Sequence, residues 1–104
     1  MSNETVPTTL VAFRRWREQP KTVFALFPQE PADYADHYCD SYERLGQHAG
    51  ADYHLCVQAS DPATAEDAAD LRRELERIGY RLKVIRRASR RVHEARQETA
   101  RSLR

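Results

Sequence analysis

The sequence predicts a single α+β domain, with a four-stranded mixed sheet, one helix packed on a face of that sheet, and a basic C-terminal helix. Three observations predict this class. The chain has 104 residues, which is enough for one hydrophobic core but too few for two. Short runs of β-branched and aromatic residues, of strand length, occur early in the chain. A strongly amphipathic helical pattern then spans residues 64–78.

Composition excludes several other classes. Charged residues make up 32% of the chain, but the net charge is only +1, so self-repulsion does not favour disorder. Three glycines and five prolines are too few for a collagen-like or linker-like chain. The longest apolar run, residues 23–27, is far below the roughly 20 residues that span a bilayer. The first residues lack a secretory signal, so we expect a cytoplasmic protein with reduced cysteines and no membrane partner.

The first half of the chain predicts a hairpin. Residues 1–8 are polar and are expected to form a flexible start before a domain over 9–95, and residues 96–104 a fraying helical tail. Residues 10–16 and 22–27 predict two strands, which a short connection joins into an antiparallel hairpin. The second strand is apolar on both faces, as expected for a strand that is covered on both sides.

The middle of the chain predicts a short helix, a turn and a third strand. Apolar side chains recur at helical spacing over residues 37–45, and Gly46 is expected to end this helix. Residues 46–50 predict a turn, because both glycines tolerate positive φ angles. Residues 53–59 predict a strand, because large apolar side chains alternate along them.

The last part of the chain predicts a helix, a strand and a second helix. Thr64 or Asp61 can cap the helix over 64–78, and Gly79 suits its C-terminal end. Residues 80–85 alternate and predict a fourth strand. It should lie parallel to the third strand through a right-handed crossover. Ser89 can cap a terminal helix, whose apolar stripe is thin and consists of Val92, Ala95, Thr99 and Leu103.

Charge is segregated along the sequence. Residues 28–70 carry ten acidic residues and one arginine, whereas residues 81–104 carry nine basic residues and two acidic ones. The candidate binding arginines are Arg86, Arg87, Arg90, Arg91 and Arg96. Like charges four residues apart on a helix cost about 0.2–0.5 kcal/mol each, and phosphates or another anion would offset that cost.

Two observations favour a solvated or self-paired helix over a nucleic-acid surface. The isoelectric point of about 7.8 is low for a nucleic-acid domain. No aromatic residue lies between residues 81 and 104 to stack on bases. Both interpretations stay open at this point.

Histidine and cysteine form a second group of candidates. A His-x-Cys spacing occurs twice, and a strand over 53–59 would point His54 and Cys56 to the same face. Zinc accepts such nitrogen and sulfur ligands, although His-x-Cys is not a usual zinc spacing. The alternative is that Cys56 is a small buried residue and that the histidines are polar surface or hydrogen-bonded groups. The candidate metal ligands are His37, Cys39, His48, His54 and Cys56.

Two weaker candidates remain. Cys39 and His48 could form a nucleophile pair that Asp52 orients, although nothing in the spacing requires it. The tyrosines suit a protein interface because they bury much area at a low entropic cost, but the same residues could pack the sheet. They are Tyr34, Tyr38, Tyr42 and Tyr53, with Trp16 elsewhere in the chain.

Five stretches carry a distinctive pattern: 25–33 (ALFPQEPAD), 39–42 (CDSY), 46–53 (GQHAGADY), 71–80 (LRRELERIGY) and 86–90 (RRASR). In these stretches the chain resembles a set of short bacterial proteins, and the resemblance covers most of residues 10–95. It implies a bacterial cytosolic protein and carries over no activity. The Gly-Gln-His-x-Gly turn is its most distinctive part, which makes Gln47 and His48, with neighbouring Tyr42, candidate binding residues.

The sequence therefore predicts a small non-catalytic binding or accessory protein without a cofactor. Segment 86–96 would contact an anionic partner, a protein or a nucleic acid, and segment 34–52 would contact a protein. The alternative is a small metal-binding protein or enzyme that uses His48 with Cys39, His54 and Cys56. The apolar strand over 22–27 also predicts a homodimer, with the terminal helix as the competing cover.

Overall fold

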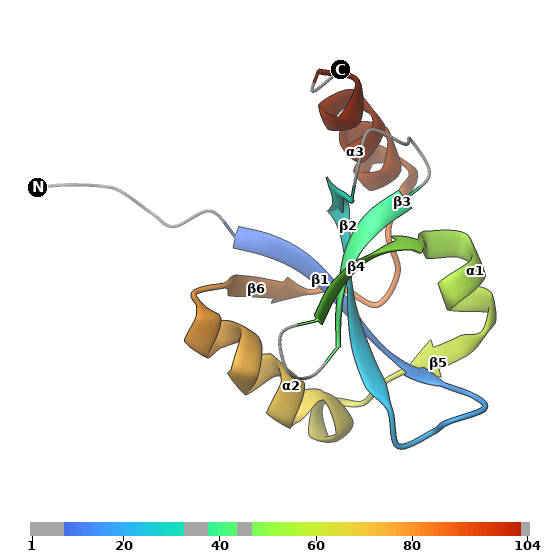
Figure 1. The fold of residues 1–104 in the computed structure, drawn as a ribbon, viewed down its shortest axis with the longest axis vertical. Helices are drawn as coiled ribbons and strands as arrows, with labels where there is room; N and C mark the ends of the chain where they lie inside the picture. Colours follow the sequence, from blue (N-terminus) through green and yellow to red (C-terminus); the bar gives the residue numbers. More distant parts are fainter. Residues whose placement is uncertain (1–7, 33–37, 44–46, 103–104) are drawn as a thin grey trace, which may run out of the picture.

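Six strands form one curled sheet in the computed structural model, which describes residues 8–32, 38–43 and 47–102, with the backbone alone for 47–49 (Figure 1). In chain order the elements are β1 (Thr8–Trp16), β2 (Val23–Pro31), β3 (Tyr38–Glu43), β4 (Gln47–Asp52), α1 (Tyr53–Gln58), β5 (Ser60–Pro62), α2 (Ala65–Ile78), β6 (Arg81–Val84) and α3 (Arg90–Ser102). The α+β class is confirmed, but the sheet has six strands where four were expected.

The sheet is an antiparallel meander from β4 through β3 and β2 to β1. The predicted hairpin is therefore confirmed, with Ala12 of β1 opposite Leu26 of β2. Two short strands share the outer edge of β1. Near its C-terminal end β1 pairs with β5 in antiparallel fashion, and near its N-terminal end it pairs with β6 in parallel fashion. This shared edge makes the strand order differ from the predicted one.

Side chains alternate between the two faces of the sheet along β1 and β2. Both faces carry apolar side chains, and other elements cover each of them. One face packs against α2 and comprises Val11, Phe13, Ala25, Phe27, Tyr42, Ala68, Leu71 and Leu75. The other face packs against α1 and the chain that follows β6. It comprises Ala12, Phe24, Leu26, Cys39 and Tyr53, with Trp16, Ala51, Cys56, Val57, Ile85 and Ala88 partly buried beside them. The two faces together form the core of one compact domain.

The helix α2 confirms the clearest sequence pattern. The Thr64 side chain accepts a hydrogen bond from the backbone N–H of Asp67 at 3.1 Å, which caps the first turn. Gly79 ends the helix with a φ of 125°, a conformation that L side chains rarely adopt. The strand predicted after it is also present, as β6.

The helix predicted over residues 37–45 is wrong, because residues 38–43 form β3. Cys39 and Tyr42 are both buried, but on opposite faces of this strand. The expected helical stripe was Tyr38, Tyr42 and Leu45, but residues four apart also share one face of a strand, and Leu45 lies outside the described residues. The predicted turn over 46–50 is also wrong for residues 47–50, which belong to β4, while Gly46 lies outside the described residues.

The strand predicted over residues 53–59 is wrong as well, because residues 53–58 form the helix α1. The Asp52 carboxylate accepts a hydrogen bond from the backbone N–H of Leu55 at 3.2 Å and so caps this helix. Leu55 is 62% exposed, although an alternating strand would have pointed it inward. With no strand here, the predicted crossover does not exist, and the parallel pairing joins β6 to β1.

The terminal helix α3 begins where predicted, but a different face is buried. The backbone N–H of Val92 lies 3.4 Å from the Ser89 hydroxyl oxygen, which accepts it. The buried residues are Arg96 and Ala100, whereas Ala95 and Thr99 of the predicted stripe are exposed. The helix α3 packs on β2, where Arg96 reaches the Pro28 carbonyl, and the homodimer stays a prediction.

Candidate functional site

Residues 85–89 connect β6 to α3 and are fixed to the sheet by their apolar members. Ile85 and Ala88 pack in the core beside Tyr53, and the backbone N–H of Ala88 donates to the Tyr53 hydroxyl at 2.8 Å. The backbone N–H of Ile85 also donates to the Val11 carbonyl at 2.8 Å. These contacts hold the connection in place while Arg86 and Arg87, between the anchors, stay exposed.

The arginines of this connection and of the first turn of α3 are poorly neutralised. Arg86, Arg87 and Arg91 form no ion pair with another described residue. Arg90 Nε lies 3.3 Å from Glu94 Oε1, but the Arg90 side chain is 94% exposed. Such an exposed pair contributes little, so the segment keeps most of its positive charge. We call residues 86–91 the basic segment.

The position of these arginines also opposes the dipole of α3. A helix N-terminus carries a partial positive charge and prefers acidic residues in its first turn. The first turn of α3 holds no acidic residue, and it begins with Arg90 and Arg91. Exposed backbone N–H groups and guanidinium groups therefore lie together at one end of this helix, an arrangement that favours an anion.

Arg96 differs from the other predicted binding arginines because it is only 2% exposed. Its Nη1 atom donates to the Pro28 carbonyl oxygen at 2.9 Å and lies 2.9 Å from Nδ1 of His93. Since a guanidinium can only donate, His93 Nδ1 accepts and the ring proton sits on Nε2. Arg96 therefore attaches α3 to β2 and has no place on an exposed binding surface.

An aromatic cluster joins α1 to α3 beside this contact. The His93 ring centroid lies 4.8 Å from that of Tyr53 and 4.9 Å from that of His54. Burial lowers the pKa of His93, and the nearby Arg96 and His54 lower it further. The neutral imidazole thus fits its role as the acceptor for Arg96.

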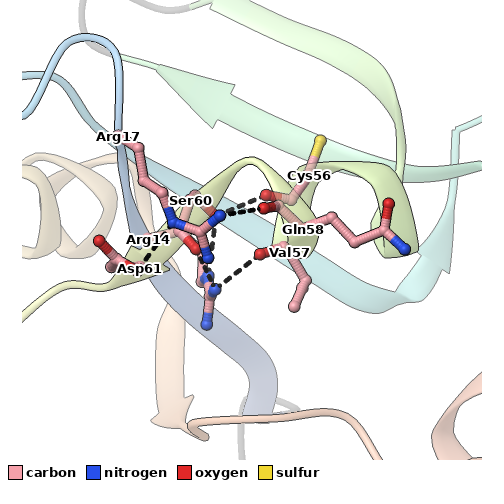
Figure 2. Close-up of polar contacts among 7 residues, drawn as sticks. All are labelled: Arg14, Arg17, Cys56, Val57, Gln58, Ser60 and Asp61. Atoms are coloured by element: carbon pink, nitrogen blue, oxygen red, sulfur yellow. Dashed lines mark hydrogen bonds and ion pairs between the residues drawn. The ribbon is translucent and has the colours of Figure 1, made fainter.

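Two further arginines stabilise the other end of α1, as Figure 2 shows. Arg14, which is 6% exposed, donates to the Val57 carbonyl at 3.0 Å, to the Ser60 carbonyl at 2.8 Å and to the Ser60 hydroxyl at 3.0 Å. Arg17 donates to the Gln58 carbonyl at 2.5 Å. Cations and hydrogen-bond donors suit the last carbonyls of a helix, so these contacts cap the short helix α1.

The predicted metal ligands are only partly described. His54 and Cys56 lie two residues apart on a helix, about 200° around its axis, so the strand-based expectation that they share a face is wrong. Among the described residues no three histidine, cysteine or acidic side chains gather as metal ligands. His37 and the side chain of His48 lie outside the described parts of the chain, and so does the side chain of Gln47.

The Cys39 thiol is unsuited to nucleophilic chemistry. Cys39 is fully buried, and burial raises the pKa of its thiol to about 12. The thiolate, which is the nucleophile, is therefore scarce at neutral pH. The backbone pairing places His48 opposite Tyr42, on the strand beside β3.

Two of the tyrosines that suggested a protein interface belong to the core. The buried Tyr42 hydroxyl donates a short hydrogen bond to the Glu74 carboxylate of α2, and Tyr53 is buried under the basic segment. Tyr38 is partly exposed, and Tyr34 lies outside the described residues. The interpretation of these residues as sheet packing is thus the better one for Tyr42 and Tyr53.

No family model, curated protein or solved structure matches the chain. In the described segments, no helix has both the length and the apolar character that crossing a membrane would require. We therefore infer function from the charge and shape of the molecular surface. Two features stand out: the basic segment, and a hollow beside α1 that the sequence did not single out.

Proposed function

We propose that this chain is a non-catalytic binding protein whose basic segment contacts an acidic surface on a protein partner. The single observation that carries the proposal is the exposure of Arg86, Arg87 and Arg91 without an ion pair to any described residue. An acidic partner would supply the charge that this part of the molecule lacks.

The pairing of charges elsewhere in the molecule supports this proposal. Residues 28–70 are strongly acidic, and they could have neutralised the basic segment. Among the described residues, the ion pairs from other elements to that acidic stretch come instead from Arg15 of β1, which pairs with Asp67, and from Arg17 just after β1, which pairs with Asp61. The acidic middle of the chain is thus partly neutralised by β1, and the basic segment remains available.

An acidic protein fits the basic segment better than a nucleic acid does. Proteins that bind single strands combine arginines with aromatic side chains on which bases stack, and residues 81–104 contain none. The isoelectric point of about 7.8 is also below the basic range of nucleic-acid domains. A patch of a few arginines with a nearly neutral remainder suits a small acidic surface.

Fluorescence anisotropy with a labelled ten-residue polyglutamate peptide tests the proposal. We expect salt-sensitive binding at low ionic strength. The triple variant Arg86→Gln/Arg87→Gln/Arg91→Gln should bind about tenfold more weakly, since surface ion pairs contribute about 0.2–1 kcal/mol each. Circular dichroism would verify that the variant stays folded, as expected for three exposed side chains.

A matched control separates a site from a general charge effect. Arg72→Gln/Arg73→Gln/Arg77→Gln removes the same charge from the exposed side of α2 and should change the affinity less than about twofold. Equal losses in both triple variants would refute a localised site. A labelled DNA duplex that bound more tightly than the peptide would show that the partner is a nucleic acid.

A further inference from the structure

A hollow of ≈ 440 Å³ lies between the sheet and α1, and no residue of the basic segment lines it. The sheet forms its floor through Phe24 and Glu43, and the end of β1 adds Trp16. The first residues of α1 form its wall, through Leu55 and Cys56. Its size falls within the range of about 300–1,000 Å³ that is typical of small-ligand pockets.

Most of the lining is apolar and aromatic. The Trp16 ring stacks on the Phe24 ring, with centroids 4.0 Å apart and planes inclined by 16°. Leu55 is exposed and adds an apolar side chain to the lining. Figure 2 shows that the Cys56 carbonyl accepts the hydrogen bond of the Ser60 hydroxyl, while the Cys56 thiol points away from this contact. This lining would accommodate the hydrocarbon body of a ligand.

The charge of the hollow is negative. Two carboxylates line it, Glu43 from β3 and Asp52 from the start of α1. Glu43 accepts the Trp16 indole N–H at 3.4 Å, and from the described residues Asp52 accepts the N–H of Leu55, so each carboxylate keeps acceptor capacity toward them. Burial raises the pKa of the Cys56 thiol, and Asp52 and Glu43 raise it further, so the thiol stays neutral beside them.

We propose that this hollow binds a small organic cation, an ammonium group on an apolar body. The carboxylates of Glu43 and Asp52 attract the charged group, and the face of the Trp16 indole that does not stack on Phe24 would favour a cation. Leu55, Phe24 and Cys56 contact the apolar body. A bare metal ion fits less well, because two carboxylates and a neutral thiol in an apolar hollow leave most of its coordination shell unfilled.

Trp16 makes the test direct, because it is the single tryptophan of the chain and lines the hollow. Titration with phenethylammonium chloride should change the intrinsic fluorescence in a saturable way. The neutral analogue 2-phenylethanol should bind about tenfold more weakly, since it lacks the charge that the carboxylates attract. The anion 3-phenylpropionate should not bind.

Two variants remove the charges while preserving the hydrogen bonds. Glu43→Gln keeps an acceptor for the Trp16 N–H, and Asp52→Asn keeps a side chain that caps α1. Each should weaken phenethylammonium binding by about three- to tenfold. The control Glu66→Gln removes an equal charge from an exposed position on α2 and should leave binding unchanged.

The outcomes distinguish this proposal from the proposed function, because binding at the basic segment does not involve Trp16. Equal affinities for phenethylammonium and 2-phenylethanol would show an apolar groove without cation recognition, and they would overturn the inference. A fluorescence change that does not saturate, or that survives in both Glu43→Gln and Asp52→Asn, would overturn it as well. If Asp52→Asn unfolds α1, the Glu43→Gln variant alone decides.

Discussion

At the scale of single residues, two buried guanidinium groups hold the helices of this chain to its sheet. Arg14 reaches the Val57 carbonyl of α1 and the Ser60 carbonyl of β5, and Arg96 reaches the Pro28 carbonyl of β2. A guanidinium group suits such positions because its several N–H groups lie in a fixed planar fork. Arginine therefore has two uses here, structural where it is buried and available to a partner where it is exposed.

Replacing Arg14 should be costly. Arg14→Leu would leave the Val57 and Ser60 carbonyls without their buried donor, so we expect the free energy of unfolding to fall by about 2–4 kcal/mol. The exposed Arg17 offers the matched comparison, and Arg17→Leu should cost less than about 1 kcal/mol. Urea denaturation measures both. Equal costs would contradict the structural role assigned to Arg14.

The two cysteines should differ in their reactivity with a thiol reagent such as DTNB. Cys39 is fully buried and its thiol has a pKa of about 12, so it should stay unreacted in the folded chain. Cys56 is partly exposed and should react slowly. We expect at most one thiol per chain to react in native buffer and both in denaturant. Rapid native labelling that Cys39→Ser abolishes would contradict this assignment.

At the scale of elements, the contact between His93 and Arg96 couples the docking of α3 to pH. The folded chain lowers the pKa of His93, through burial first and then through Arg96 and His54, whereas an unfolded histidine titrates near 6.5. The unfolded state therefore binds more protons as the pH falls. The stabilisation is complete above pH 6.5 and decreases below it.

Urea denaturation at pH 7.5 and at pH 5.5 checks this coupling. The wild-type chain should lose stability at the lower pH, because protonated His93 can no longer accept the Arg96 N–H. His93→Asn supplies a neutral acceptor at a similar place, so this variant should lose less stability between the two pH values. An unchanged pH dependence in His93→Asn would assign the loss to other groups.

Local sequence patterns predicted those elements in which the burial of the side chains follows the pattern of apolar residues. The hairpin of β1 and β2, the helix α2 and the strand β6 follow from alternation, from the Thr64 cap and from Gly79. A helix was expected at β3 and a strand at α1, and both predictions are wrong because contacts outside the local sequence decide these elements. Tyr38 and Tyr42 are four residues apart, a spacing that puts two side chains on one face of a strand as well as of a helix. The cap from Asp52 begins a helix in the stretch whose alternation had predicted a strand.

The candidate sites were predictable only where they are local in sequence. The basic segment is a run of neighbouring arginines, so its charge could be seen without a structure. The burial of Arg96 could not be predicted from the sequence, because its acceptor, the Pro28 carbonyl, lies 68 residues away along the chain. The hollow is also non-local, since Trp16, Glu43 and Asp52 come together only through the order of β1, β2 and β3 in the sheet.

At the scale of the whole molecule, the two proposed surfaces carry opposite charge. The hollow is lined by carboxylates from β3 and the start of α1, whereas the basic segment precedes and opens α3. With a net charge of only +1, neither surface reflects an overall excess of one sign. Local arrangement, and not the total charge, is therefore what would steer partners to each surface.

NMR titration shows residue by residue whether an acidic partner binds at the basic segment. The ¹⁵N-labelled chain is titrated with the polyglutamate peptide at low ionic strength, and amide shifts are followed residue by residue. We expect the largest changes at residues 85–91, and we expect them to disappear in Arg86→Gln/Arg87→Gln/Arg91→Gln. Shifts centred on another part of the molecule, or no shifts at all, would contradict this expectation.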